Sequence, residues 1–412
     1  MWKFILKRVG QMIVLFYIFL ALLFVLLDLQ PGDISQQFVG NPDIPPEAKQ
    51  LMIEQLGLDE PKHIQLWNHL KNYSTFNMGA SWSQYPREVS DILFSALPRT
   101  IYLFLTATIL AYILGFWTGK IVAWKRNTAT EKAVMGTSIF LWTVFYPWFA
   151  ILMLWFFAAY LGWFPVGKFV TLSFESRPDL VNSISDVLFR TSGNEAASGW
   201  TSSAAPGAND VFMLLFSSLI IATIVFFGIR AIVKRQVKDP SSQARLFTGG
   251  TALVVVGFTI FWLTNEYGPW AFDIFWHSVI PVATLTLVSY AGTTLLTRTS
   301  MIETLKEDYI LTARAKGVPD VTIRDRHSAR NAMLPVTTSL VLALATVIGG
   351  GIITEQIFSW PGIGQTYLAA LNSEDIPLTM GALALIGILA LIAHLVADIL
   401  YAYLDPRIRV QG

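Results

Sequence analysis

The sequence contains long apolar runs that carry almost no charge. A helix rises about 1.5 Å per residue, so about 20 such residues cross a membrane hydrocarbon core about 30 Å thick. Only 14% of the 412 residues are charged, against about 25% in soluble globular proteins. We therefore expect an all-α polytopic membrane protein. Eight windows predict eight membrane-spanning helices: residues 9–29, 100–124, 133–161, 211–233, 246–264, 279–296, 336–357 and 379–403.

The distribution of Lys and Arg predicts the orientation of these spans. Short cytoplasmic loops carry an excess of basic residues. If the N-terminus is inside, the basic segments 120–132, 230–245 and 298–330 all fall on the cytoplasmic side. The basic start of the chain is similar to a signal peptide, but its apolar run is too long and no small-residue cleavage site follows. We expect a multi-pass protein of the plasma or inner membrane, with an uncleaved first span and both termini in the cytoplasm.

Several function classes are excluded by composition and motif. The chain has no cysteine, which excludes disulfides, thiolate metal sites and a cysteine nucleophile. Its net charge of +1 gives no indication of nucleic acid as a partner. His63, His69, His277 and His327 lack metal-ligand spacing, so we expect surface or packing roles and no metal site. No Gly-x-x-x-x-Gly-Lys-Ser/Thr phosphate loop is found, so the chain cannot bind ATP by that means.

The segment between the sixth and seventh windows is strongly charged and patterned. Residues 303–316 contain neither Gly nor Pro and predict a helix, Gly317 can adopt the left-handed conformation that ends it, and Pro319 can begin a second helix. The chain is expected to re-enter the membrane near Pro335. Its basic residues are also typical of any cytoplasmic loop. The helix–turn–helix pattern additionally predicts docking on a soluble partner.

The residues TARAKG at 312–317, followed by Pro319 and Pro335, resemble the cytoplasmic loop motif of permeases from ATP-binding-cassette importers. The form is similar to that of the dipeptide and oligopeptide branch, B-type subunit. Thr312 stands where the generic motif has Glu, so a role specific to that glutamate is not carried over. Five further segments resemble the same family in the same order: DLQPGD at 28–33, LGLDEP at 56–61, LGWFPVG at 161–167, EQIFSWPGIGQ at 355–365 and DILYAYLDPRIR at 398–409.

The resemblance implies a type I importer permease with a core of six helices. This chain has about a hundred extra residues between Gly167 and Trp276, which contain two of the eight windows. We expect these two inserted helices to lie at the periphery, against lipid or a partner subunit. The expected segments are an N-terminal helix at 1–30, an external helical cap at 31–97, helices two and three at 98–165, the insertion at 166–276, and the remaining core at 277–412 with a cytoplasmic coupling loop at 299–335.

The resemblance also implies a function and a set of partners. An external solute-binding protein would deliver solute to two permease subunits, namely this chain and a homologous second one. In this family the two permeases usually form a heterodimer. Two cytoplasmic ATPases would bind ATP and Mg²⁺, and this chain would be neither an enzyme nor a cofactor-binding protein. The ATPase contact is expected at Asp308, Tyr309, Thr312, Ala313, Arg314, Ala315, Lys316, Gly317 and Pro319. An external gate or binding-protein contact is expected at Glu355, Trp360, Pro361, Gly362 and Gly364.

Three alternatives remain open at this point. Di- and oligopeptides are the first choice of solute, and oligosaccharides are the alternative, because the family branch includes importers of both. His394 and Asp398 are four residues apart in the last window and lie on one helix face. Ionisable residues within a span are candidates for proton relays, so a proton-coupled secondary transporter is a second hypothesis. A membrane enzyme is the third, and the scattered external carboxylates Asp33, Asp59 and Asp375 favour outer-face or binding-protein roles over it.

Overall fold

The structure is a computed structural model, and it describes residues 2–29, 60–170, 207–237, 239–265, 267–347 and 351–404. Across these ranges the chain is built of helices, with one isolated antiparallel bridge between Ala80 and Glu88. The predicted all-α fold is confirmed. The chain divides into two compact units, which we call unit 1 (Met1–Ile151 with Pro281–Gly412) and unit 2 (Leu152–Ile280).

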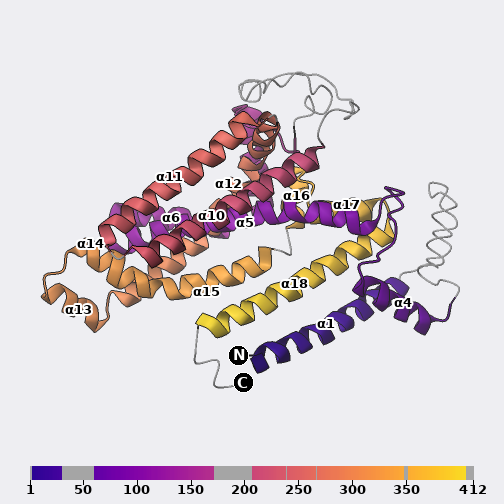
Figure 1. The fold of residues 1–412 in the computed structure, drawn as a ribbon, viewed down its shortest axis with the longest axis horizontal. Helices are drawn as coiled ribbons and strands as arrows, with labels where there is room; N and C mark the ends of the chain where they lie inside the picture. Colours follow the sequence, from indigo (N-terminus) through magenta and orange to yellow (C-terminus); the bar gives the residue numbers. More distant parts are fainter. Residues whose placement is uncertain are drawn as a thin grey trace. The chain divides into compact units, whose positions relative to one another are not determined.

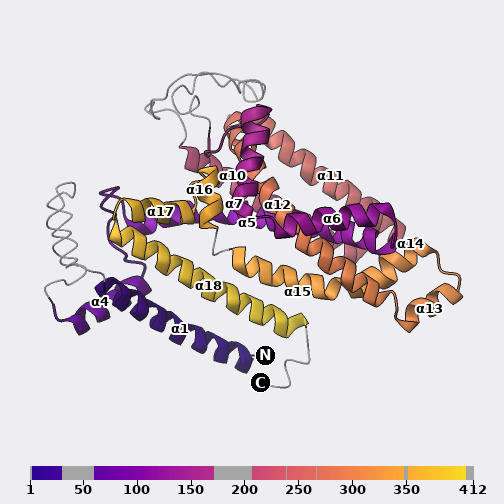
Figure 2. The same ribbon diagram turned by 180° about the vertical axis from the view of Figure 1, so that it is seen from behind.

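Unit 1 contains both ends of the chain. The first helix α1 and the last helix α18 lie side by side in both ribbon views, and α17 packs against α18 and α5 (Figures 1 and 2). The helices of this unit are α1 (Trp2–Asp28), α4 (Lys62–Ser74), α5 (Val89–Trp124), α6 (Ala129–Thr143), α7 (Tyr146–Met153, whose last residues enter unit 2), α13 (Asp308–Ala315), α14 (Asp320–Thr322), the π-helix η3 (Ile323–Ser328), α15 (Ala329–Val347), α16 (Ile352–Phe358), α17 (Ile363–Asn372) and α18 (Ile376–Leu404).

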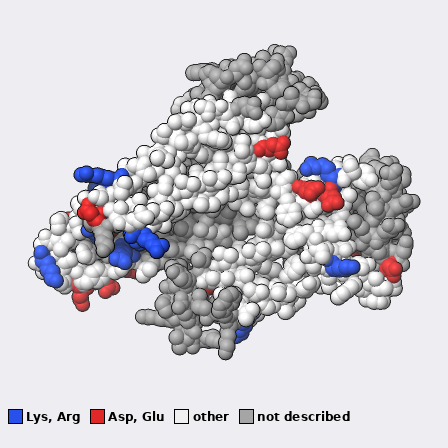
Figure 3. All heavy atoms as spheres, in the orientation of Figure 1, with Lys and Arg blue, Asp and Glu red and all other residues white. Residues whose placement is uncertain are grey.

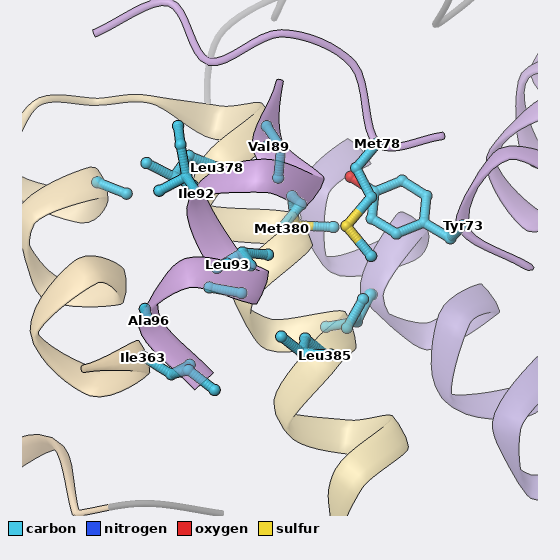
Figure 4. Packing of buried hydrophobic residues seen from close by; sticks show 14 of the residues in the cluster. Tyr73, Met78, Val89, Ile92, Leu93, Ala96, Ile363, Leu378, Met380 and Leu385 are labelled. Atoms are coloured by element: carbon cyan, nitrogen blue, oxygen red, sulfur yellow. The ribbon is translucent and has the colours of Figure 1, made fainter. Parts of the chain in front are cut away.

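The main apolar core of unit 1 joins α1, α4, α5, α17 and α18. Val89 and Leu93 of α5 face Leu378 and Leu385 of α18, and the ring of Tyr73 closes one side (Figure 4). All of these side chains are buried. Burial of one such side chain is worth about 1.5–3 kcal/mol, so this cluster fixes the start of α5 against the last helix.

Asp375 precedes α18 and is completely buried. Its carboxylate accepts hydrogen bonds from the Ser81 hydroxyl (2.5 Å), from the backbone N–H (3.1 Å) and hydroxyl (2.7 Å) of Ser83, and from the N–H of Leu378 (3.1 Å). The expectation that Asp375 is exposed at the outer face, to solvent or to a binding protein, is therefore wrong. Its carboxylate instead caps α18 and joins the 81–83 loop to that helix. The sequence does not reveal this contact, because Ser81 and Asp375 are 294 residues apart.

Unit 2 contains a helical hairpin. Asp239 caps the second helix by accepting from the N–H of Ser242 (2.9 Å), and Pro240 occupies the first turn. The indole N–H of Trp262 donates to the Ser218 hydroxyl across the hairpin (3.2 Å). The helices of this unit are the π-helix η1 (Leu154–Tyr160), α10 (Ala208–Gln236), α11 (Pro240–Thr264) and the first part of α12 (Gly268–Thr304), which continues into unit 1.

Six described helices are long and apolar enough to cross a membrane: Ile5–Leu26, Val89–Trp124, Ala208–Gln236, Ser241–Thr264, Gly268–Thr304 and Ile376–Ile399. A seventh candidate is the pair Ala129–Thr143 and Tyr146–Tyr160, bent by 108°. The predicted count of eight is not confirmed, although both helices of the insertion are present. The predicted window 133–161 is thus divided into two helices, because Val144 is extended and Pro147 stands in the first turn of α7.

The seventh predicted window, 336–357, is divided between α15 and α16. Residues 348–350 lie outside the described part of the chain. Pro335, near which the chain is expected to re-enter the membrane, lies inside α15, which begins at Ala329. Residues 31–59 of the expected external cap also lie outside the described residues. The described part of the cap contains α4, with Pro61 as its N-cap, and its Trp67 is exposed whereas His69 and Tyr73 are buried.

Candidate functional site

The segment with the family's loop motif folds into a compact helical hairpin, which we call the 308–328 hairpin (α13, α14 and η3). Gly317 has a φ of +71°, and its N–H donates to the carbonyl of Arg314 (2.9 Å) while the N–H of Val318 donates to that of Ala313 (3.1 Å). These two bonds form a Schellman end, which requires a left-handed residue and therefore favours glycine. Pro319 caps α14. The predicted glycine stop and the second helix are confirmed.

The start of the hairpin differs from the prediction. A single helix was expected over 303–316, but α12 ends at Thr304 and α13 begins at Asp308. A tight turn separates them, in which the N–H groups of Lys306 and Glu307 donate to the carbonyls of Glu303 and Thr304. Glu307 then adopts an extended conformation. The hairpin is thereby set off from the long helix α12 as a separate element.

One face of the hairpin packs against its own chain. Ile310, Ala313 and Ile323 are buried together, with Trp124 at the end of α5 and Val318 packed against them. Ala313 was predicted to contact a partner, but its methyl group is covered within this chain. The guanidinium carbon of Arg314 lies 5.9 Å from the centre of the Trp124 ring, a cation–π geometry.

The opposite face of α13 is exposed. Asp308, Leu311, Thr312 and Ala315 follow the i, i+3, i+4, i+7 spacing of one helix face, and each is exposed. Leu311 is 58% exposed at the centre of this face. Lys and Arg side chains gather around α13 in the space-filling view, with Asp and Glu side chains among them (Figure 3). The described residues of the chain therefore leave this face of α13 uncovered.

Charged contacts hold the hairpin to its neighbours. Lys120 of α5 pairs with Asp325 at 3.0 Å, and Arg324 pairs with the same carboxylate at 2.9 Å. The Arg324 guanidinium and the Lys120 ammonium hold the pKa of Asp325 well below its usual range. The amide of Asn331 donates to the Tyr309 hydroxyl (2.8 Å). The hairpin is therefore linked to both α5 and α15.

The second predicted site is the segment 351–365, which we call the Glu355 loop. Glu355 is completely buried and accepts hydrogen bonds from the Thr100 hydroxyl (2.7 Å) and the N–H of Gln365 (3.0 Å). Thr100 in turn accepts from the N–H of Ile363 (2.9 Å). The helix α16 that carries Glu355 is not among the candidate membrane spans. Burial raises the pKa of Glu355 to about 7, although its hydrogen bonds favour the charged form.

The remaining residues predicted for this site pack around the same carboxylate or its helix. Trp360 is buried, donates its indole N–H to the Arg99 carbonyl (3.1 Å), and stacks on Tyr102. The Arg99 guanidinium donates to the Pro361 carbonyl (3.2 Å). A Cβ on Gly362 would lie 2.3 Å from a Glu355 carboxylate oxygen, so only glycine fits there.

The structure therefore brings the predicted residues of this loop together, since Gly364 also packs closely on Ile352. Their side chains contact this chain itself. A role in binding an external protein stays a prediction.

Helix α5 connects the two sites, and sequence reasoning did not single out its contact residues. Thr100 and Arg99 reach the Glu355 loop, whereas Lys120 and Trp124 reach the 308–328 hairpin. The 25 residues from Thr100 to Trp124 extend about 36 Å along the helix. One signal was present in the sequence: Arg99 is a basic residue at the end of a span where the positive-inside rule predicts none.

The proposed proton relay of the last span is not formed. Asp398 pairs with Arg8 of α1 at 3.3 Å, and His394 is exposed. The described residues contain no group of three or more His, Asp or Glu side chains that could hold a metal ion. Asp398 therefore joins the first and last helices of unit 1.

Comparisons with known proteins agree on the whole length of the chain. The family model described as "Binding-protein-dependent transport system inner membrane component" matches residues 111–410, and its N-terminal counterpart matches residues 1–103. The chain is 27% identical over 411 residues to the di/tripeptide transport system permease protein DppB of Pseudomonas aeruginosa, covering 100% of both chains. It is 26% identical to the oligopeptide transport system permease protein AppB of Bacillus subtilis, covering 93% of this chain and 92% of the other. It is 27% identical to the dipeptide transport system permease protein DppB of Escherichia coli, covering 99% of both.

Proposed function

Because the chain belongs to the family of binding-protein-dependent transport system inner membrane components, we propose that it is one permease subunit of an ATP-driven importer of di- and oligopeptides. Its apolar helices make it an integral protein of the inner membrane. The peptide substrate is supported by the names of its relatives, which are di/tripeptide, dipeptide and oligopeptide permeases.

The proposed assembly contains four kinds of component. A second, homologous permease completes the transmembrane path, an external binding protein delivers the peptide, and two ATPases bind ATP and Mg²⁺ in the cytoplasm. Both termini and the 308–328 hairpin face the cytoplasm in this arrangement. The clustering of basic residues around α13 supports that orientation.

The observation that carries the proposal is the two-faced construction of the 308–328 hairpin. Its inner face is fixed to α5 through Ile310, Ala313 and Ile323. Its outer face, centred on Leu311, is exposed and is not covered by the described residues of the chain. An ATPase that binds the outer face moves the hairpin as a rigid body, and the packed inner face transfers that movement to the membrane-spanning helices. Coupling through a rigid, packed element is the physical link that such a mechanism requires.

Different residues of the hairpin have different roles in this account. Asp308, Leu311, Thr312 and Ala315 form the contact face, and Tyr309 and Lys316 lie at its edge. Ala313 and Arg314 attach the helix to Trp124, and Gly317 and Pro319 set the angle of the turn. The latter four act by positioning the contact face.

The movement reaches the outer side through α5. Its contacts with Glu355 and Trp360 couple the hairpin to the Glu355 loop, which we assign to the external gate. The loop changes position when α5 does, because Thr100 bonds both Glu355 and the first residue of α17. This gives one continuous helix with a coupling site at each end.

Uptake into proteoliposomes tests the function. The purified complex is reconstituted with ATP inside, and the binding protein and a radiolabelled dipeptide are added outside. We expect uptake that requires ATP and the binding protein, that persists after a protonophore collapses the proton gradient, and that unlabelled dipeptide but not maltotriose abolishes. Uptake of radiolabelled maltotriose, with no uptake of the dipeptide, would establish the oligosaccharide alternative. Uptake driven by the proton gradient without ATP would contradict the importer.

A further inference from the structure

The inserted hairpin of unit 2 contains a pocket that the transport function does not use. It has a volume of about 260 Å³ and lies between α10 and α11, near the turn that joins them. Its walls are aromatic and aliphatic, with one cationic side chain. The lining residues are Phe226, Ile229, Arg230, Phe247 and Thr251.

Contacts between the two helices fix the walls of this pocket. Gly250 lets α11 approach α10 closely, because a Cβ at that position would lie 2.8 Å from the side chain of Ile229. Toward the other end of the hairpin, Trp262 is hydrogen-bonded to Ser218. The guanidinium carbon of Arg230 lies 5.9 Å from the centre of the Phe247 ring, so the charge is held over an aromatic wall.

The pocket lies at the level where the membrane core ends. The uncharged part of α10 before Arg230 extends from residue 211 to 229. This length spans about 28 Å, close to the thickness of the hydrocarbon core. Arg230 therefore lies at the boundary between acyl chains and headgroups, and Phe226 lies one turn deeper.

The charges around the pocket are predominantly positive. Lys234 and Arg235 follow Arg230 within two turns of α10, and Arg245 lies at the start of the apolar part of α11. The acidic residue of this region, Asp239, accepts hydrogen bonds from Ser241 and Ser242, which hold its pKa below the usual range. Its carboxylate is engaged in capping α11. Among the described residues of the hairpin, no ion pair to Arg230 is found.

We propose that this pocket binds an anionic phospholipid of the surrounding membrane. The headgroup phosphate lies on Arg230 within the positive field of Lys234 and Arg245, whereas Arg235 lies about 140° round the helix from Arg230, and one acyl chain runs along Phe226 and Ile229. Basic pockets between helices at the membrane boundary are typical sites for anionic headgroups. An apolar wall next to the cation favours a lipid over a free phosphate ion. The inference rests on the membrane location and not on the transported solute.

The test uses the full chain, purified from membranes and examined by native mass spectrometry with added phosphatidylglycerol or phosphatidylcholine of the same acyl composition. We expect phosphatidylglycerol to bind more tightly, and Arg230→Gln to weaken its binding about fivefold, the effect of one basic residue near an anionic headgroup. Arg235→Gln is the matched control, since it removes the same charge from the same helix outside the pocket lining. It should weaken binding less than twofold.

A second variant keeps the test independent of the charge at position 230. Thr251→Leu adds apolar volume at an exposed position of the lining without changing charge, and it should also weaken phosphatidylglycerol binding. Equal effects of Arg230→Gln and Arg235→Gln, or equal binding of the two lipids, would overturn the proposal. Binding of free glycerol phosphate with the same affinity as the lipid would also overturn the proposal, and would assign the pocket to a soluble anion. Loss of complex assembly in Arg230→Gln, with lipid binding unchanged, would assign the pocket to an acidic side chain of a partner subunit.

Discussion

The two ends of α5 meet surfaces of opposite construction. At the Glu355 loop, a buried carboxylate, a buried tryptophan and closely packed glycines satisfy one another within the chain. At the 308–328 hairpin, only the inner face is packed, and the outer face displays Leu311 and charged residues. The first region is packed within the chain, whereas the second leaves one face uncovered, and we propose that a partner ATPase contacts that face. Substitutions in the Glu355 loop should therefore destabilise the chain, and substitutions on the outer face of the hairpin should affect only its coupling.

The largest effect on stability is expected for Trp360→Ala. This side chain is completely buried, stacks on Tyr102 and bonds the Arg99 carbonyl. Removal of such an aromatic side chain costs about 3–5 kcal/mol. Thermal unfolding of the purified chain measures the loss. Trp67→Ala is the matched control, because Trp67 is 67% exposed, and an equal loss in both variants would contradict the assigned packing.

The next largest effect is expected for Gly362→Ala. The added methyl group would overlap the Glu355 carboxylate and the Thr100 hydroxyl, which lie 2.3 and 2.4 Å from its position. Such overpacking in a filled core costs about 1–3 kcal/mol. Gly136→Ala is the control, because nothing lies within 4 Å of a Cβ there and the residue is helical. A chain that tolerates Gly362→Ala as well as Gly136→Ala would exclude the close packing of the loop.

A smaller effect is expected for Gly317→Ala in the hairpin. Here no atom obstructs a Cβ, and the cost comes from the positive φ alone. An alanine in the left-handed conformation costs about 1–2 kcal/mol. We expect little change in the thermal unfolding of the whole chain, because the turn is local. Protease cleavage of the hairpin should become faster in Gly317→Ala and not in Gly317→Asn, since asparagine tolerates this conformation. Equal cleavage of wild type and Gly317→Ala would contradict the Schellman turn.

The smallest effect is a pH dependence that arises from Glu355. Its pKa is raised by burial to about 7 in the folded chain, from an ordinary value near 4.5. The folded state therefore holds the proton more tightly, and this contribution to stability is complete at low pH and is lost as the pH rises toward and through 7. The unfolding temperature of wild type should fall relative to that of Glu355→Gln between pH 5 and pH 8. Parallel curves of unfolding temperature against pH for the two proteins would show that Glu355 is ionised throughout this pH range.

Local chemistry determined which features the sequence could predict. The glycine stop at Gly317 and the start of α14 after Pro319 depend on residues within one turn, and both are confirmed. The apolar windows located both helices of the insertion for the same reason. The family resemblance, which rests on ordered short motifs, is confirmed by the matches over residues 1–103 and 111–410.

Long-range contacts were beyond sequence reasoning. Thr100 and Glu355 are 255 residues apart, and Ser81 and Asp375 are 294 apart, so nothing in the local pattern pairs them. An external carboxylate appears solvated in a sequence, but both Glu355 and Asp375 are buried by donors from other elements. The break near Val144 was concealed because both halves of 129–160 are apolar, and hydropathy does not register the direction of a helix. The Arg8 partner of Asp398 likewise comes from the opposite end of the chain.

The contact face of the hairpin is tested most directly by ATP hydrolysis in the purified complex, stimulated by peptide-loaded binding protein. Leu311→Asp places a charge at the centre of the exposed face. The control is Leu29→Asp, which makes the same change at a leucine that is 73% exposed and directly follows the last residue of α1. We predict that Leu311→Asp lowers the stimulated rate at least about tenfold, the loss of one well-buried interface contact. The folding of the chain should be unchanged by Leu311→Asp, and Leu29→Asp should retain the stimulated rate. Full stimulation of a Leu311→Asp complex that assembles normally would contradict the account.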